Sequence, residues 1–130
     1  MKKISWVTHP LYDIPLPKNH KFTSSKFSDL LSELKKSGLS EYANIFYPEK
    51  ASIEDLLRVH DRNYIDKISN GTLDPAEERR LGLKWSPELS NRSFLAVNGT
   101  LLTAKLAIKE RIACHVAGGT HHSHFDFGSG

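Results

Sequence analysis

The 130-residue sequence predicts an α/β fold in which helices cover both faces of a parallel sheet. One observation is the β-branched, alternating segment 4–8, which is typical of a strand. Another is the continuous apolar run 112–117, which follows a long helical pattern and precedes two glycines, as a central strand buried on both faces does. Capped helical patterns fill the chain between them. Because only these two strands are convincing, we expect an incomplete sheet.

The first strand is expected to end at His9–Pro10, since proline cannot donate a hydrogen bond to a sheet and restricts the residue before it. Residues 13–20 then carry two prolines among turn-forming residues, which predicts an ordered, extended loop. Loops of this kind often carry functional residues. His9, Tyr12 and His20 flank this loop, although each such side chain is more often a loop contact than a ligand.

Three helical segments follow, each with local start or stop signals. The first begins at Ser25, because its apolar residues recur at helical spacing, and ends at Gly38. The second begins at the capping residue Ser52. The third begins at Asp61 and ends at Gly71, which gives a pair of short helices.

Two more helices are predicted in the second half of the chain. Asp74 caps a short one that closes at Gly82, and the longest runs from Ser86 to about Lys109 as a largely buried helix. Gly99 lies inside it at a cost of about 1 kcal/mol relative to alanine, which suggests close approach of a neighbouring element. A local kink is the alternative reading.

Composition and charge favour one domain spanning residues 1–130, because the chain has the usual size of a single domain. The net charge is only +3 and basic and acidic residues alternate, so nucleic acid and anionic membranes are not expected partners. The single Cys114 suits a reducing compartment and a buried position. The N-terminus lacks a long apolar stretch, so neither a signal peptide nor a membrane span is expected, and we predict a cytoplasmic protein.

Two adjacent histidines, His121 and His122, follow the glycine pair at 118–119. Glycines permit the irregular backbone needed to turn consecutive side chains toward one cavity. Two nearby imidazoles titrate as a coupled pair, in which one stays neutral and the other takes up a proton near pH 7, as general acid–base catalysis requires. A hydrogen-bonded packing pair is the structural alternative. His122 and His124 also have the spacing of a metal chelate, a weaker signal because no Cys, Asp or Glu lies at a diagnostic distance.

Seven stretches of the sequence, in order, resemble the N-terminal part of the histone deacetylase superfamily, particularly its bacterial, class IV-like branch. They are HPLY at 9–12, LPKNHKF at 16–22, ASIEDLLRVH at 51–60, NGTL at 70–73, ERRLG at 78–82, WSP at 85–87 and GGTHH at 118–122. The resemblance implies the first part of an arginase/deacetylase-type parallel sheet. It also implies a zinc-dependent deacetylase that removes acetyl or related acyl groups from lysine side chains or small amines.

The resemblance also implies roles for individual residues. His122 would be the principal general base and acid, and His121 its electrostatic partner, with neither binding zinc. Gly130 matches the glycine whose backbone lines the acyl-lysine tunnel. Tyr12 and His20 would lie on the loop near the rim of the pocket.

Several parts of the family pattern are missing from this sequence. The zinc ligands, an Asp-x-His and a later Asp, are expected downstream of residue 130, and the chain contains no Asp-x-His. The tyrosine that polarises the carbonyl and the carboxylates that orient the two histidines are missing too, and Lys21 stands where arginine is more common. We therefore expect a truncated deacetylase domain that is inactive alone.

Two other functions remain possible on sequence grounds. The first is a non-catalytic α/β binding or interaction module that pairs its open sheet edge with another chain. The second is a histidine-rich metal binder that uses His121, His122 and His124. The acyl group, the amine substrate and the oligomeric state are not specified by the sequence.

Overall fold

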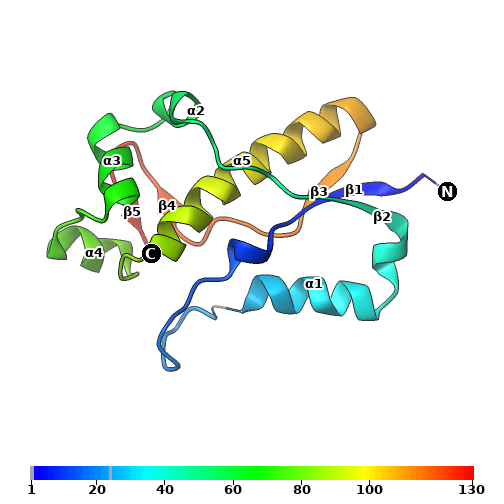
Figure 1. Cartoon of the computed structure of the whole chain (residues 1–130), viewed down its shortest axis with the longest axis horizontal. Coiled ribbons are helices and arrows are strands. Elements are labelled where there is room, and N and C mark those ends of the chain that lie inside the picture. Colours follow the sequence, from blue (N-terminus) through cyan, green and yellow to red (C-terminus); the bar gives the residue numbers. More distant parts are fainter. Residues whose placement is uncertain (1, 24) are drawn as a thin grey trace.

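The computed structural model describes residues 2–23 and 25–130, and it contains the expected parallel sheet (Figure 1). Three strands form it: β1 (Ile4–Val7), β2 (Ala43–Phe46) and β3 (Ala113–His115). Their order is β2-β1-β3, and both pairings are parallel. The predicted α/β class is therefore confirmed.

The described residues also form five α-helices, whose boundaries follow the predicted caps. They are α1 (Lys26–Lys36), α2 (Ile53–Leu57), α3 (Arg62–Asn70), α4 (Pro75–Leu81) and α5 (Pro87–Glu110). At the start of each of the last four, a serine or aspartate side chain accepts a hydrogen bond from a backbone N–H of the first turn. Asp74 and Glu77 form a complete capping box. These helices are specified locally, which is why sequence signals locate them.

The helices divide into layers around the sheet (Figure 1). Helix α5 packs against β1 and β3, while α1 runs on the other side of the sheet in this view and contacts the short 3-10 helices η1 (Pro10–Tyr12) and η2 (Leu39–Tyr42). Helices α3 and α4 gather near the first turns of α5, together with an antiparallel hairpin of β4 (His122–Ser123) and β5 (Gly128–Ser129). The two histidines of interest thus lie on a hairpin beside the N-terminal half of α5.

Strand β2 was not predicted. Its four residues, Ala-Asn-Ile-Phe, are too short for an alternating pattern to stand out, and it is defined by pairing with a distant segment. Ile4 pairs with Ala43 and Val7 with Phe46, so β1 becomes the central strand. The burial of its side chains agrees with this central position, since Ser5 and Val7 are fully buried.

The prediction that residues 112–117 form a central, doubly covered strand was wrong. β3 is an edge strand, and in the described part of the chain no strand pairs with its outer side. Cys114 is exposed, contrary to the expectation of a buried cysteine, and Ile112 is 54% exposed.

Helix α5 is buried on one face only, contrary to the expectation of a largely buried helix. Its buried positions are Leu89, Ser90, Arg92, Leu95 and Gly99, and none lies C-terminal to Gly99 at the middle of the helix. Ile108 near the other end is 83% exposed, although Glu110 in the same last turn accepts a hydrogen bond from the Ser5 hydroxyl of β1.

Gly99 lies where α5 crosses a hydrogen-bonded pair of side chains, Tyr12 and His115. The Tyr12 hydroxyl and His115 Nε2 are 2.8 Å apart, and a Cβ atom at Gly99 would collide with both groups. The predicted close approach of a neighbouring element at Gly99 is therefore confirmed.

Burial of histidines makes the fold sensitive to acid. The pKa values of His9, His115 and His121 all lie below the ordinary value of 6.5, chiefly because burial disfavours the charged ring. The folded chain then binds fewer protons than the unfolded chain, so the stability that these rings contribute is complete above pH 6.5 and is lost as the pH falls from 6.5 toward their folded pKa values. We expect the melting temperature to fall between pH 7.5 and 5.5.

The His115→Gln variant provides the matched comparison, because glutamine can hydrogen-bond but does not titrate. Its melting temperature is expected to depend less on pH over this range than that of the wild-type chain. An equal or steeper dependence would contradict the assignment to His115.

Candidate active site

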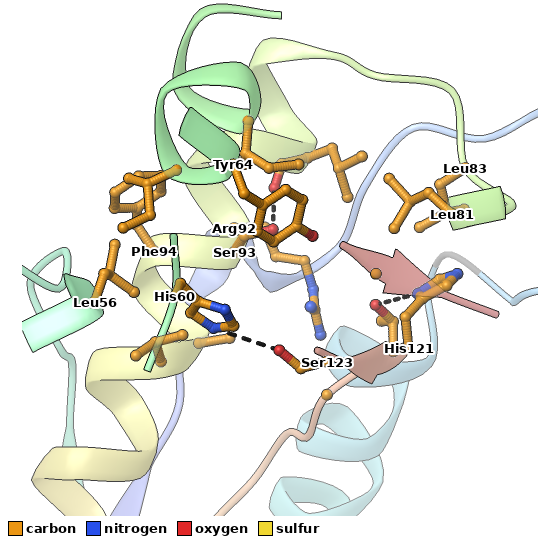
Figure 2. A pocket seen from close by; sticks show the side chains of 18 of the residues that line it. Leu56, His60, Tyr64, Leu81, Leu83, Arg92, Ser93, Phe94, His121 and Ser123 are labelled. Atoms are coloured by element: carbon orange, nitrogen blue, oxygen red, sulfur yellow. Dashed lines mark hydrogen bonds between the residues drawn. The ribbon is translucent and has the colours of Figure 1, made fainter. Parts of the chain in front are cut away.

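A cavity of about 200 Å³ lies between helices α3 and α5 and the segment that carries the two histidines (Figure 2). Most of its wall is apolar, with side chains from α2 to α5 and the loop after α4. These include Leu56, Ile65, Ile68, Leu81, Leu83 and Leu89. Residues 119–123 add polar groups to the wall, as do His60, Tyr64, Arg92 and Ser93. A few polar groups in a mostly apolar cavity are the usual arrangement of a ligand site.

His121 is a half-buried ring that is fixed by its neighbours. Its Nδ1 lies 2.7 Å from the Thr120 hydroxyl, and the ring packs directly against the backbone of Gly130. Its Nε2 also lies near Gly82 at the end of α4. Glycines at these two positions let backbone segments approach the imidazole closely.

The surroundings of His121 keep it uncharged at neutral pH. Burial lowers its pKa most, and the positive charge of Arg92 and the rings of His20 and His122 lower it further. A neutral imidazole can accept a proton on one nitrogen and donate from the other.

His122 lines the same cavity as His121 but is exposed. It is the first residue of β4 and pairs with Ser129 of β5. In the described residues no hydrogen bond joins the two imidazoles, so the hydrogen-bonded packing pair considered from sequence does not form. Both residues thus border one cavity, with His121 half-buried and His122 exposed to solvent.

His124 belongs to a different cluster. Its ring stacks on Phe127 at 4.0 Å between centroids, and the Arg80 guanidinium lies 3.2 Å from the centroid of the same Phe127 ring. This cluster attaches the hairpin to α4. His124 is not among the residues that line the cavity.

His60 ties the hairpin to the turn between α2 and α3. Its Nδ1 donates to the His124 carbonyl at 2.9 Å, and its Nε2 lies 3.4 Å from the Ser123 hydroxyl (Figure 2). The backbone N–H of Asp61 also donates to the Phe125 carbonyl. The rings of His60 and Tyr64 also meet edge to face, with 5.8 Å between their centroids.

Arg92 connects η1 to the loop that precedes the two histidines. It is 3% exposed, its Nε donates to the Tyr12 carbonyl at 2.9 Å, and its Nη2 donates to the Gly118 carbonyl at 2.7 Å. Arg92 was not recognised from the sequence as a loop contact. The available signal was its spacing, because Leu89, Arg92, Leu95 and Gly99 recur on one helical face.

The predicted substrate residues occupy three different environments. Tyr12 is fully buried and its hydroxyl faces His115, so its side chain does not line the cavity. His20 is half-buried, accepts from the Phe22 N–H at Nδ1 and donates from Nε2 to the Gly82 carbonyl at 3.3 Å. Gly130 lies against the His121 ring. Contact with a substrate is not tested at any of the three positions, so these roles stay predictions.

The described residues do not fit a zinc ion. Across residues 2–23 and 25–130, no group of three or more His, Cys, Asp or Glu side chains comes together as a metal site. A metal site made of His121, His122 and His124 is therefore not formed, since the His124 ring stacks on Phe127 instead.

Known proteins resemble this chain over most of its length. The family model described as "Histone deacetylase domain" matches residues 20–130. An uncharacterized protein of Picosynechococcus sp. is 40% identical over 124 residues, which cover 95% of this chain and 41% of that protein. Histone deacetylase 2 of Arabidopsis thaliana is 31% identical over 139 residues, covering 100% of this chain and 36% of that protein. The chain thus spans about two fifths of the length of these curated relatives.

Proposed function

This chain belongs to the histone deacetylase family, and on that premise we propose that it forms the part of a deacetylase domain that carries the proton-transfer histidines. The substrate of the complete domain is an acetylated lysine side chain or a small acetylated amine. The reaction is hydrolysis of the amide, which yields acetate and the free amine. We place it in the cytoplasm and in the class IV-like branch, on the sequence features given above.

The observation that carries this proposal is the common location of His121 and His122 on the wall of one cavity. Amide hydrolysis needs a group that removes a proton from the attacking water and a group that delivers a proton to the leaving amine. A histidine with a pKa near or below neutrality can do both in turn.

We assign these two roles to the imidazole of His122. It is exposed at the cavity wall, so a water molecule or an amine nitrogen can reach it. His121 would act beside it as a fixed neighbour whose low pKa keeps it neutral at pH 7. An uncharged His121 places no positive charge beside the His122 side chain.

The family implies zinc, and the residues of this chain do not supply its ligands. We propose that side chains outside these 130 residues hold the ion and that the chain alone does not hydrolyse the amide. What this chain contributes is proton transfer at His122, the neutral His121, and the loops that position them.

The substrate roles of three further residues belong to the same proposal. The backbone of Gly130 would border the acyl group, since it lies against the His121 ring. His20 would act from the rim through its contact with Gly82. Tyr12 would act indirectly, because its carbonyl is bound by Arg92 while its side chain is buried.

A chimeric protein tests the proposal. These 130 residues replace the matching part of the Picosynechococcus protein, which supplies the remaining three fifths of its length. We expect the chimera to release acetate from an acetyl-lysine peptide. An inactive, well-folded chimera beside an active Picosynechococcus protein would contradict the proposal.

One observation favours a second candidate, a non-catalytic module that binds another chain through its sheet edge. The outer side of β3 is open within the described residues, and exposed Cys114 and Ile112 accompany it. Such a module would form a defined oligomer in sedimentation experiments. Replacing Ala113 by proline on this strand would then abolish the oligomer.

No helix among the described residues combines the length and apolar character that crossing a bilayer needs.

A further inference from the structure

Arg92 is a buried cation without a carboxylate partner. It lies in the first half of α5 at 3% exposure, and none of the ion pairs among the described residues includes it. Burial lowers the pKa of Arg92, and the side chains of Tyr12 and Asp13 act in the opposite direction. Burying a guanidinium is costly unless its N–H groups find strong acceptors.

The acceptors are two backbone carbonyls from segments far apart in the sequence. Nε donates to Tyr12 at the end of η1, and Nη2 donates to Gly118 in the loop before the histidines, at 2.9 and 2.7 Å. The guanidinium carbon also lies 4.8 Å from the centre of the Phe27 ring of α1, within the range of a cation–π interaction. In Figure 2 the side chain points from α5 toward the segment that carries His121 and Ser123.

The planar guanidinium makes these bonds in a fixed relative orientation, so the two carbonyls are held in a fixed geometry. Apart from its two chain neighbours, no residue has an atom within 4 Å of where a Cβ of Gly118 would stand. That side of Gly118 is open, and the bond to Arg92 holds its carbonyl against α5. The hairpin beyond is held separately, by His60 and by the Phe127 cluster.

We propose that Arg92 is a positioning residue for the histidine loop, which it clamps to the loop of Tyr12 so that His121 and His122 stay at the cavity wall. The hydrogen bonds by which Arg92 joins the two segments are observed geometry. Their importance for catalysis rests on the proposed function.

The same guanidinium acts on His121 through its charge. Burial is the main cause of the low pKa of His121, and Arg92, His20 and His122 are the titratable and charged groups that add to it. Arg92 also lowers the pKa of His115 on β3, after burial. Removing the cation should therefore raise the pKa of His121, which loss of packing alone would not do without also exposing the ring.

Three variants of the 130-residue chain test the clamp. Arg92→Met keeps the length of the buried stem and removes the charge and the donors. Arg92→Lys keeps the charge but replaces the planar fork by a single ammonium. Lys105→Met is the matched control, since it removes an exposed charge from the same helix.

Amide hydrogen exchange and the NMR titration of His121 are the two measurements. In Arg92→Met we expect amide exchange in residues 119–122 to become about tenfold to a hundredfold faster than in the wild-type chain, with no such acceleration in β1. We also expect the pKa of His121 to rise. In Arg92→Lys the loop should also exchange faster, while the pKa of His121 stays low. The control should change neither.

Unchanged exchange in the loop, or the same acceleration in β1 as in the loop, would overturn the proposal. If Arg92→Met does not fold, Arg92→Lys is the deciding variant. Amide exchange in its loop at the wild-type rate would show that the planar guanidinium is not needed, and would overturn the proposal. Neither measurement uses deacetylation, so a failure of the proposed function would appear in the chimera alone and leave this result standing.

Discussion

Replacing Gly99 by alanine is expected to lower the free energy of unfolding by about 3 kcal/mol, the upper part of the usual range for overpacking a core. The added methyl group would collide with the Tyr12 hydroxyl and with His115 Nε2. These two groups are hydrogen-bonded at 2.8 Å and belong to fully and half-buried side chains, so neither can move without breaking the bond. For a chain of this size the loss lowers the melting temperature by about 10 °C, measured by circular dichroism.

Gly118→Ala is the matched control for this variant. Gly118 has open space around the position of a Cβ and does not need a positive φ angle. Its replacement should leave the melting temperature nearly unchanged. A Gly99→Ala chain as stable as Gly118→Ala would show that α5 does not approach η1 and β3 as closely as described.

The second large effect concerns catalysis. In the chimera with the Picosynechococcus protein, we expect His122→Ala to lower the rate of acetate release by about 10²- to 10⁴-fold, the usual contribution of a general acid–base group. The substitution removes the imidazole that is exposed at the cavity wall. Circular dichroism should show an unchanged fold, since the ring is not part of the core.

His124→Ala is the control here, because His124 lies two residues away on the same hairpin, stacks on Phe127 and does not line the cavity. We expect it to keep most of the activity. Equal losses in the two variants would indicate a damaged hairpin, and a fully active His122→Ala would remove His122 from the mechanism.

The sequence predicts those parts of the fold that are specified locally. Ser52, Asp61, Asp74 and Ser86 begin helices because each side chain bonds to the backbone of its own first turn. Gly99 was also identified, since a glycine within a helical pattern is unfavourable unless something lies close to it.

The sequence does not predict the parts that depend on distant partners. β2 exists because residues 43–46 pair with β1, and nothing within that segment distinguishes it from a loop. The edge position of β3 depends on which strands are present, and the apolar run 112–117 is the same at an edge or in the centre.

The candidate site shows the same division. The glycines and adjacent histidines are contiguous in sequence and were recognised, and the structure places His121 and His122 at one cavity. Arg92 and His60 were not recognised as loop contacts, because their partners lie 26 and 64 residues away. Only the folded chain brings these groups together.

The most direct test of the account compares the purified 130-residue chain with the chimera in the same assay, in which acetate release from an acetyl-lysine peptide is followed with added zinc. The account predicts turnover by the chimera and none above the buffer rate by the chain alone, because its described residues form no metal site. Zinc-dependent turnover by the 130 residues alone would contradict it.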